Sequence, residues 1–141
     1  SGITVVDGLM SAGELDELVR CASAYVSLHR GEGLGLTIAE AMAHGVPAIA
    51  TEYGGNLDFM DHTTAALIPY DLVVVGEEGR PYPPDAYWAE ADVGEAAQAI
   101  RAAFDNGPEI RARSERGRER VAATFAQEPV LRFLADRGFT R

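Results

Sequence analysis

The sequence predicts an α/β fold: a parallel, Rossmann-like sheet flanked by helices, followed by further helices at the C-terminal end. Short apolar runs of strand length alternate with helical segments between residues 3 and 68, a pattern typical of repeated βα units. Two glycine-rich turns directly follow two of the predicted strands. Beyond residue 91 the pattern is helical, so we expect one domain over residues 1–141 with a helical part at 92–141.

The first predicted unit is a strand followed by a helix. Residues 3–6 (Ile-Thr-Val-Val) predict a short buried strand. Ser11 is the expected N-cap of a helix that runs to about Cys21, because Glu14 completes a capping box. We expect three apolar side chains of this helix to face inward: Leu15, Leu18 and Val19.

The second unit contains the first glycine-rich loop. Residues 24–28 predict a strand, 29–34 a loop and about 35–44 a helix. Gly45 is the expected glycine cap at the end of this helix. Residues 48–50 (Ala-Ile-Ala) predict the next strand.

The second glycine-rich turn is Gly54-Gly55-Asn56, which opens a short helix to about Met60. Residues 65–68 predict one more strand. In a parallel sheet, ligands bind at the carboxyl ends of the strands. We therefore expect the two glycine loops, which follow strands ending near Leu28 and Ala50, to meet at one ligand-binding edge.

Residues 70–90 contain glycines, prolines and aromatic residues without periodicity. We interpret them as an irregular insertion packed by its aromatic side chains. A plain surface loop and a contact for an acceptor or partner both remain open. The predicted helices that complete the chain are 92–105, 108–124 and 127–136.

Composition excludes several classes of protein. The formal net charge is −10, which argues against nucleic acid as a partner, because phosphate backbones require a basic surface. No apolar run approaches the roughly 18 residues that a membrane span needs. A single cysteine, Cys21, favours a reducing, cytoplasmic setting. The start, Ser1-Gly2-Ile3, has neither a methionine nor the basic-then-apolar layout of a signal peptide.

Glu40 is the polar exception in an apolar helix. Ile38, Ala41 and Met42 share one face of the predicted helix, and further apolar residues cover much of the rest. A carboxylate buried there would cost several kcal/mol unless it were paired or hydrogen-bonded. Glu40 could pair with His44 one turn on. Alternatively, it accepts hydrogen bonds from the hydroxyls of a sugar or ribose.

The loop before this helix has the features of an anion site. Gly33 and Gly35 let the backbone approach a ligand closely, and free amides at a helix N-terminus attract phosphate. Glu32 precedes the helix. It is either a solvated loop acid or a group that contacts sugar hydroxyls and stabilises positive charge at the anomeric carbon.

Two other side chains are candidates. His29 could touch phosphates or cap the loop, and Asn56 could bond a sugar hydroxyl or serve the turn. The acids and histidine near residue 60 have no metal-binding spacing.

The span from Ser27 to Asp58 resembles the donor-binding half of the retaining glycosyltransferases with the GT-B fold, most closely family 4. The segment Arg30-Gly31-Glu32-Gly33-Leu34-Gly35-Leu36, then Ala39-Glu40-Ala41-Met42-Ala43 and Gly45-Val46-Pro47, matches the E-x7-E motif of that family almost throughout, and Gly54-Gly55-Asn56 extends the match. The resemblance weakens after about Ile68. It implies that the chain is the C-terminal domain of such an enzyme and binds a nucleoside-diphosphate sugar.

The resemblance also implies roles for individual residues. Glu40 would bind the ribose hydroxyls, and Glu32 would act as the catalytic residue beside the transferred sugar. Thr37 would add a hydroxyl to the phosphate. Four backbone amides would face the sugar and the diphosphate: those of Gly33, Leu34, Gly35 and Leu36. No metal or other cofactor is expected, because family members generally hold the diphosphate with amides and basic side chains.

Departures from the family pattern limit what this chain can do alone. The family's diphosphate-binding Arg and Lys, and the N-terminal domain that binds an acceptor glycan or lipid-linked saccharide, are absent from the sequence. We therefore expect a fragment that is inactive by itself, and an open sheet edge that could support a homodimer. Family members of this kind build surface polysaccharide, and the full-length protein could lie peripheral to the membrane.

The sequence is also compared with what two other function classes require. A non-catalytic interaction or scaffold domain derived from the same fold is the alternative. A dinucleotide-dependent oxidoreductase is disfavoured, because the first turn, Asp7-Gly8-Leu9-Met10, does not fit a Gly-x-Gly-x-x-Gly pattern.

Overall fold

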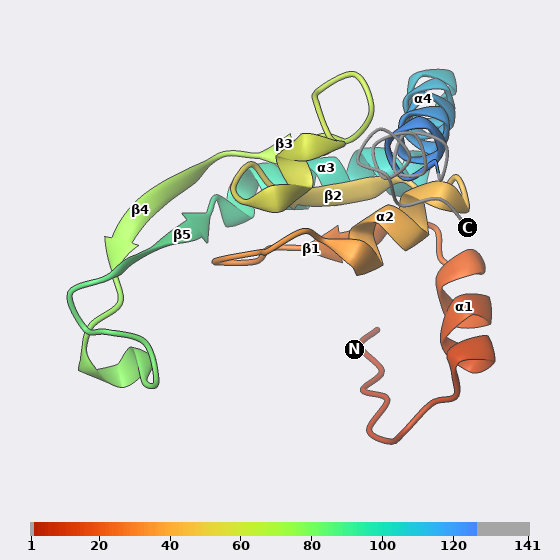
Figure 1. Ribbon diagram of the computed structural model, residues 1–141. Coiled ribbons are helices and arrows are strands. Elements are labelled where there is room, and N and C mark those ends of the chain that lie inside the picture. The colour runs from red at the N-terminus through yellow and green to blue at the C-terminus, as the bar shows by residue number, and fades with distance from the viewer. Residues whose placement is uncertain (1, 127–141) are drawn as a thin grey trace, which may run out of the picture.

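The fold is an α/β layer structure, as predicted, with a short parallel sheet between helices. The computed structural model describes residues 2–126. The elements in chain order, with η marking 3₁₀ helices, are α1 (Ala12–Arg20), β1 (Tyr25–Ser27), α2 (Leu36–Ala43), β2 (Ala48–Thr51), η1 (Gly55–Asp58), β3 (Ala66–Ile68), β4 (Tyr70–Val74), η2 (Glu77–Gly79), β5 (Tyr87–Ala91), α3 (Val93–Asp105) and α4 (Pro108–Thr124). Strands β1, β2 and β3 are parallel and adjacent in that order, a Rossmann-like arrangement (Figure 1).

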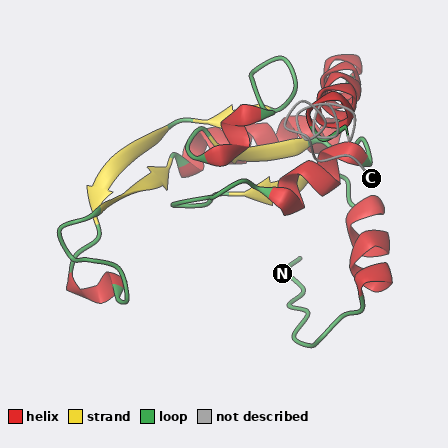
Figure 2. Cartoon of the chain, viewed as in Figure 1, coloured by secondary structure: helices red, strands yellow, loops and turns green. Residues whose placement is uncertain are grey.

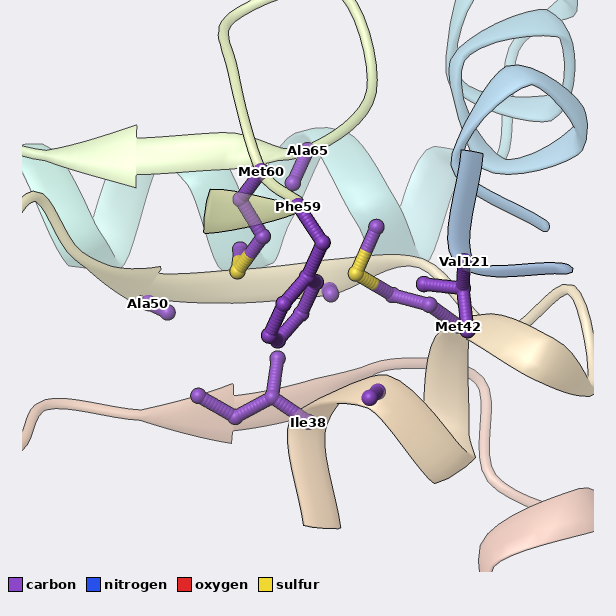
Figure 3. Packing of buried hydrophobic residues seen from close by; sticks show 9 residues of the cluster. Ile38, Met42, Ala50, Phe59, Met60, Ala65 and Val121 are labelled. Carbon is purple, nitrogen blue, oxygen red and sulfur yellow. The ribbon is translucent and has the colours of Figure 1, made fainter. Parts of the chain in front are cut away.

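Strand β2 lies at the centre of the fold and is buried on both faces, as expected for a parallel strand between helices. Because side chains alternate along a strand, Ala48 and Ala50 join one apolar cluster and Ile49 joins another. The first cluster packs α2 and α4 against the sheet around Phe59, as Figure 3 shows. The second joins β2 and β3 to α3. The sheet therefore has α2 on one face and α3 on the other.

Helix α4 packs closely against α2 at Gly117. A Cβ atom at this buried position would lie 2.7 Å from the backbone oxygen of Thr64 and 3.0 Å from Cε of Met42. We predict that Gly117→Ala lowers the free energy of unfolding by about 1–2 kcal/mol, because overpacking outweighs the better helix propensity of alanine. Urea unfolding followed by circular dichroism measures this.

The matched control is Gly13→Ala in α1, where a Cβ would meet nothing within 4 Å. It should raise the free energy of unfolding by roughly 0.4–1 kcal/mol. Equal stabilisation by both substitutions would contradict the close packing of α4.

Several local predictions are confirmed. Ser11 and Glu14 form the capping box of α1, with the Glu14 backbone amide 3.3 Å from Ser11 Oγ and the Ser11 amide 2.8 Å from Glu14 Oε2. The hydrogen bonds from Ser11 lower the pKa of the Glu14 carboxyl. Gly45 follows α2 with a φ of +74°, the left-handed conformation of a glycine cap. Helices α3 and α4 fall where the sequence places them, whereas the predicted helix 127–136 lies outside the described residues.

Two predictions at the N-terminal end are wrong. Residues 3–6 form no strand; they run as an extended loop with Ile3 and Val5 more than 80% exposed (Figure 2). Helix α1 has no buried residue, so Leu15 and Leu18 do not face a core. The apolar pattern is present in both cases, but no described strand pairs with 3–6 and no described element covers α1 sufficiently to bury it. Cys21, directly after α1, is also exposed.

The prediction of an irregular segment at 70–90 is also wrong. Strands β4 and β5 form an antiparallel ribbon, paired from Tyr70 with Ala91 to Val74 with Tyr87, that extends beyond the sheet (Figures 1 and 2). Its strands are rich in β-branched and aromatic residues, which favour extended structure. Most of the glycines and prolines that obscured this pattern lie in the turn that joins the strands.

Strand β1 forms one edge of the parallel sheet, and β3 forms the other, among the residues that the structure describes. A homodimer through such an edge stays a prediction. None of the helices within residues 2–126 combines the length and apolar character that crossing a membrane requires.

Candidate functional site

The two glycine loops meet at the carboxyl ends of β1 and β2, as predicted. The amide of Gly55 donates a hydrogen bond to the carbonyl oxygen of Glu32 over 3.0 Å. A Cβ atom at Gly55 would lie 1.9 Å from the carbonyl oxygen of Gly33 and 2.9 Å from Cα of Leu34. The contact between backbones is so close that only glycine fits at position 55. The second loop therefore holds the first one in place.

The Glu32 carboxylate caps helix α2. Its Oε1 atom accepts a hydrogen bond from the amide of Gly35 over 3.0 Å, and the side chain is half-buried. Gly35 is the N-cap of α2 and has a φ of +84°, in the region that favours glycine. Glu32 is thus not a fully solvated loop acid. Its charge lies at the positive end of a helix, which stabilises a carboxylate.

The next amides at the start of α2 are those of Leu36, Thr37 and Ile38. None of them has an acceptor within the helix, because the first helical bond runs from Ala39 to Gly35. Leu36 and Thr37 are exposed. This helix start therefore presents donors and a partial positive charge beside the Glu32 carboxylate.

Glu40 lies one turn further along α2 and is exposed. The prediction of a mostly buried helix is therefore wrong on this side. Ile38, Ala39, Ala41 and Met42 are buried, but no described element covers the face that carries Leu36 and Glu40. Pairing with His44 does not occur, since His44 Nε2 instead lies 2.7 Å from Asp16 Oδ1 and that hydrogen bond lowers the pKa of the Asp16 carboxyl. Within the described residues, the Glu40 carboxylate has no hydrogen-bond or ion-pair partner, and it is accessible to a ligand.

His29 is held by protein groups at both ring nitrogens. Nε2 lies 2.7 Å from the carbonyl oxygen of Tyr53, and Nδ1 lies 3.0 Å from Oγ of Ser27. A carbonyl oxygen only accepts, so Nε2 carries a proton and Nδ1 accepts from the serine hydroxyl in the neutral ring. In this conformation His29 ties the ends of the two strands together.

Asn56 and Thr37 also make protein contacts. Asn56 is fully buried, and its amide donates to the carbonyl oxygen of Thr51 over 3.1 Å. Its side chain is therefore not offered to a ligand in this conformation, and it supports the loop from below: a Cβ on Gly35 would lie 3.3 Å from Cβ of Asn56. The Thr37 hydroxyl accepts a hydrogen bond from the Tyr25 hydroxyl over 2.9 Å and retains its own proton to donate.

One neighbour of the site was missed by the sequence analysis. Arg30, at the start of the first loop, reaches the β4–β5 ribbon: its Nη2 lies 2.7 Å from Glu90 Oε2 and its guanidinium carbon 4.5 Å from the ring centre of Trp88. The backbone amide of Ala89 also donates to the Arg30 carbonyl over 3.0 Å. The β-branched and aromatic content of residues 70–74 and 87–91 was the signal that could have predicted these strands, although it does not indicate where they pack.

Within residues 2–126, no group of three or more His, Cys, Asp or Glu side chains is arranged to hold a metal ion. The expectation that no cofactor is needed stays a prediction.

Comparison with known proteins identifies the family to which this site belongs. Residues 2–106 match the sequence model of the family described as "Glycosyl transferases group 1". Over 134 residues the chain is 28% identical to the lipopolysaccharide core biosynthesis mannosyltransferase LpsB of Rhizobium meliloti (strain 1021). The aligned region covers 93% of this chain and 33% of LpsB. The chain thus spans about a third of the length of this relative.

Proposed function

Because the chain belongs to the group 1 glycosyl transferases, we propose that it binds a nucleoside-diphosphate sugar. The full-length protein that contains this chain transfers the sugar to an acceptor hydroxyl with retention of anomeric configuration. One observation carries this proposal: the half-buried Glu32 carboxylate, the open amides of α2 and the exposed Glu40 carboxylate gather along the start of one helix at the carboxyl edge of the sheet. This edge is where α/β sheets bind their ligands.

The diphosphate of the donor would lie at the start of α2. Amides of Gly33 to Thr37 supply donors, and the helix end supplies about half a positive charge. Glu32 already uses the amide of Gly35, so the phosphate oxygens would take the amides on either side of it. The net charge of −10 opposes binding of an anion. Basic groups from outside this chain would strengthen the site.

The two glutamates have different tasks. Glu40, exposed on α2, accepts hydrogen bonds from the ribose hydroxyls of the nucleotide, and hydrogen bonds to a charged group contribute about 1.5–3 kcal/mol. Glu32, fixed by its bond to Gly35, stabilises the positive charge that develops at the anomeric carbon as the nucleotide leaves. Asn56 and His29 act by positioning the two loops.

The name of the relative suggests a sugar and a process. LpsB of Rhizobium meliloti is a mannosyltransferase of lipopolysaccharide core biosynthesis. We infer mannosyl transfer, or transfer of a similar hexose, to a glycan or lipid-linked saccharide in surface polysaccharide synthesis. Parts of the protein beyond this chain would complete the binding site for the acceptor.

Calorimetric titration of the chain with UDP, GDP, and their mannose and glucose conjugates tests donor binding. Glu40→Ala should weaken the binding of the preferred nucleotide tenfold or more, the loss of about 1.5–3 kcal/mol expected for charged hydrogen bonds. Its unfolding free energy should stay within about 0.5 kcal/mol of the parent, because the side chain is exposed and unpaired among the described residues.

Glu119→Ala is the matched control, since Glu119 is also an exposed glutamate on a helix, α4. It removes the same charge from a residue that belongs neither to the two loops nor to α2, and it should leave nucleotide affinity unchanged. A folded chain that binds none of these nucleotides would refute donor binding by this part of the protein and favour the scaffold alternative. Equal loss in both variants would mean that the effect is not specific to Glu40, because removal of one negative charge by itself would favour an anionic ligand.

A further inference from the structure

A pocket of about 500 Å³ lies between the first glycine loop and the β4–β5 ribbon. Its volume is within the roughly 300–1,000 Å³ typical of small-molecule sites. Aromatic side chains dominate its lining, together with one arginine: Tyr53, Tyr82, Tyr87, Trp88 and Arg30. Gly31, the neighbour of Glu32, also lines it. The pocket is therefore continuous with the loop that carries the proposed catalytic carboxylate.

The part of the pocket formed by Arg30 and Trp88 is held in place by contacts within the protein. The ribbon is held to the first loop by the Ala89–Arg30 backbone bond and by the Arg30–Glu90 ion pair. Trp88 lies beneath the Arg30 guanidinium and against the backbone turn at Gly79, where a Cβ would come within 3.1 Å of the ring. A side chain that is already held in place, as Trp88 is, loses little entropy when it binds a ligand.

The ring geometry and the charge both favour a neutral sugar. Tyr82 and Trp88 meet edge to face, with ring centres 6.4 Å apart and planes at 74°. This pair forms an angled wall rather than two parallel faces, so it does not sandwich a flat nucleobase but suits the C–H faces of a puckered pyranose ring. The charge of Arg30 is paired with Glu90, which leaves little attraction for a free anion.

Hydrogen-bonding groups for sugar hydroxyls are also available. The hydroxyls of Tyr53, Tyr82 and Tyr87 make no hydrogen bond to another described residue, and Tyr82 and Tyr87 are more than 60% exposed. Each hydroxyl both donates and accepts, as a sugar hydroxyl does. Arg30 keeps N–H donors beyond those used by Glu90. The combination of ring faces with free donors and acceptors matches a carbohydrate.

We propose that this aromatic pocket binds a pyranose ring of the acceptor glycan, next to the sugar held at Glu32. The assignment to the acceptor rests on the proposed glycosyl transfer; binding of a neutral sugar to the pocket does not. The pocket would give this chain a direct share in acceptor recognition.

The chain offers a specific optical probe of the pocket, because Trp88 is its only tryptophan. We would titrate the folded chain with the methyl glycosides of mannose, glucose and rhamnose, with mannobiose, and separately with UDP and GDP, while following Trp88 fluorescence. At least one neutral saccharide should produce a saturable change. Tyr82→Ala should weaken its affinity about tenfold, since it removes one wall of the ring pair.

Two further variants complete the test. Tyr87→Ala, in the other lining tyrosine that is more than 60% exposed, should also weaken saccharide affinity. Leu72→Ala changes an exposed apolar residue on the same ribbon outside the pocket and should leave affinity within about twofold. Circular dichroism checks that each variant is folded.

Two outcomes would overturn the proposal: no saccharide changes Trp88 fluorescence in the folded chain, or UDP or GDP alone changes it and displaces the saccharide, which would make this a nucleobase pocket. The result is separable from donor binding, because Glu40 does not line the pocket. If the chain binds a saccharide but no nucleotide, the pocket proposal stands and the donor function is refuted. If it binds a nucleotide but no saccharide, the donor function stands and the pocket proposal is refuted.

Discussion

Gly55→Ala is expected to lower the free energy of unfolding by about 3 kcal/mol, at the upper end of the usual cost of overpacking. A methyl group at this position would lie 1.9 Å from the carbonyl oxygen of Gly33, and both partners are backbone, so no side chain can swing away. The loops must separate, which also breaks the hydrogen bond from the Gly55 amide to Glu32. Urea unfolding followed by circular dichroism gives the difference directly.

The same substitution should reduce nucleotide binding, because Glu32 and the start of α2 lose their support. Gly33→Ala is the informative control, since a Cβ there would meet nothing within 4 Å. It should change stability by no more than about 0.5–1 kcal/mol yet weaken nucleotide binding if the open side of Gly33 faces the ligand. A Gly55→Ala variant as stable as the parent chain would contradict the contact between the loops.

Glu32 is expected to separate activity from stability. Glu32→Gln, in the protein at its natural length, should reduce kcat about 10²-fold or more, because it removes the charge that stabilises the transition state. Its stability should change little, since the amide oxygen of glutamine can still accept the bond from Gly35. Glu32→Ala should lose activity and, in addition, about 1 kcal/mol of stability, the usual cost of a lost helix cap.

Kinetic assays with the preferred donor, paired with urea unfolding of both variants, test whether activity is lost in both variants while stability is lost only in Glu32→Ala. Full activity in Glu32→Gln would show that the charge of Glu32 has no catalytic role and that the residue serves only as the cap of α2. The same conclusion would follow if, in both variants, activity fell only as far as the free energy of unfolding fell.

Local rules predicted much of this protein. The capping box at Ser11, the glycine after α2 and the alternation of strands and helices depend on neighbours along the chain, and they appear where the pattern places them. The meeting of the two glycine loops followed from one topological rule, that carboxyl ends of parallel strands share an edge. The family match over residues 2–106 agrees with the motif on which the resemblance rests.

The wrong predictions of burial share one cause. An apolar pattern shows that a segment could pack against another element, but it does not show whether such an element covers it. Residues 3–6 and the apolar face of α1 have the pattern of buried elements and remain exposed. Glu40 is exposed for the same reason, since no described element covers its side of α2. The β4–β5 ribbon was missed because pairing between distant strands is not visible in short-range periodicity.

The sequence by itself determined the α/β architecture, the two loops at one edge and the residue types of the proposed donor site, because these depend on local propensity and on connectivity. Only the tertiary structure decided how that site is built: that Gly55 fixes the Glu32 loop through its backbone, that Glu40 is exposed while Asn56 is buried, and that a distant ribbon brings an aromatic pocket beside Gly31. These features arise from contacts between segments far apart in the chain, and burial and contact distance exist only once those segments have packed.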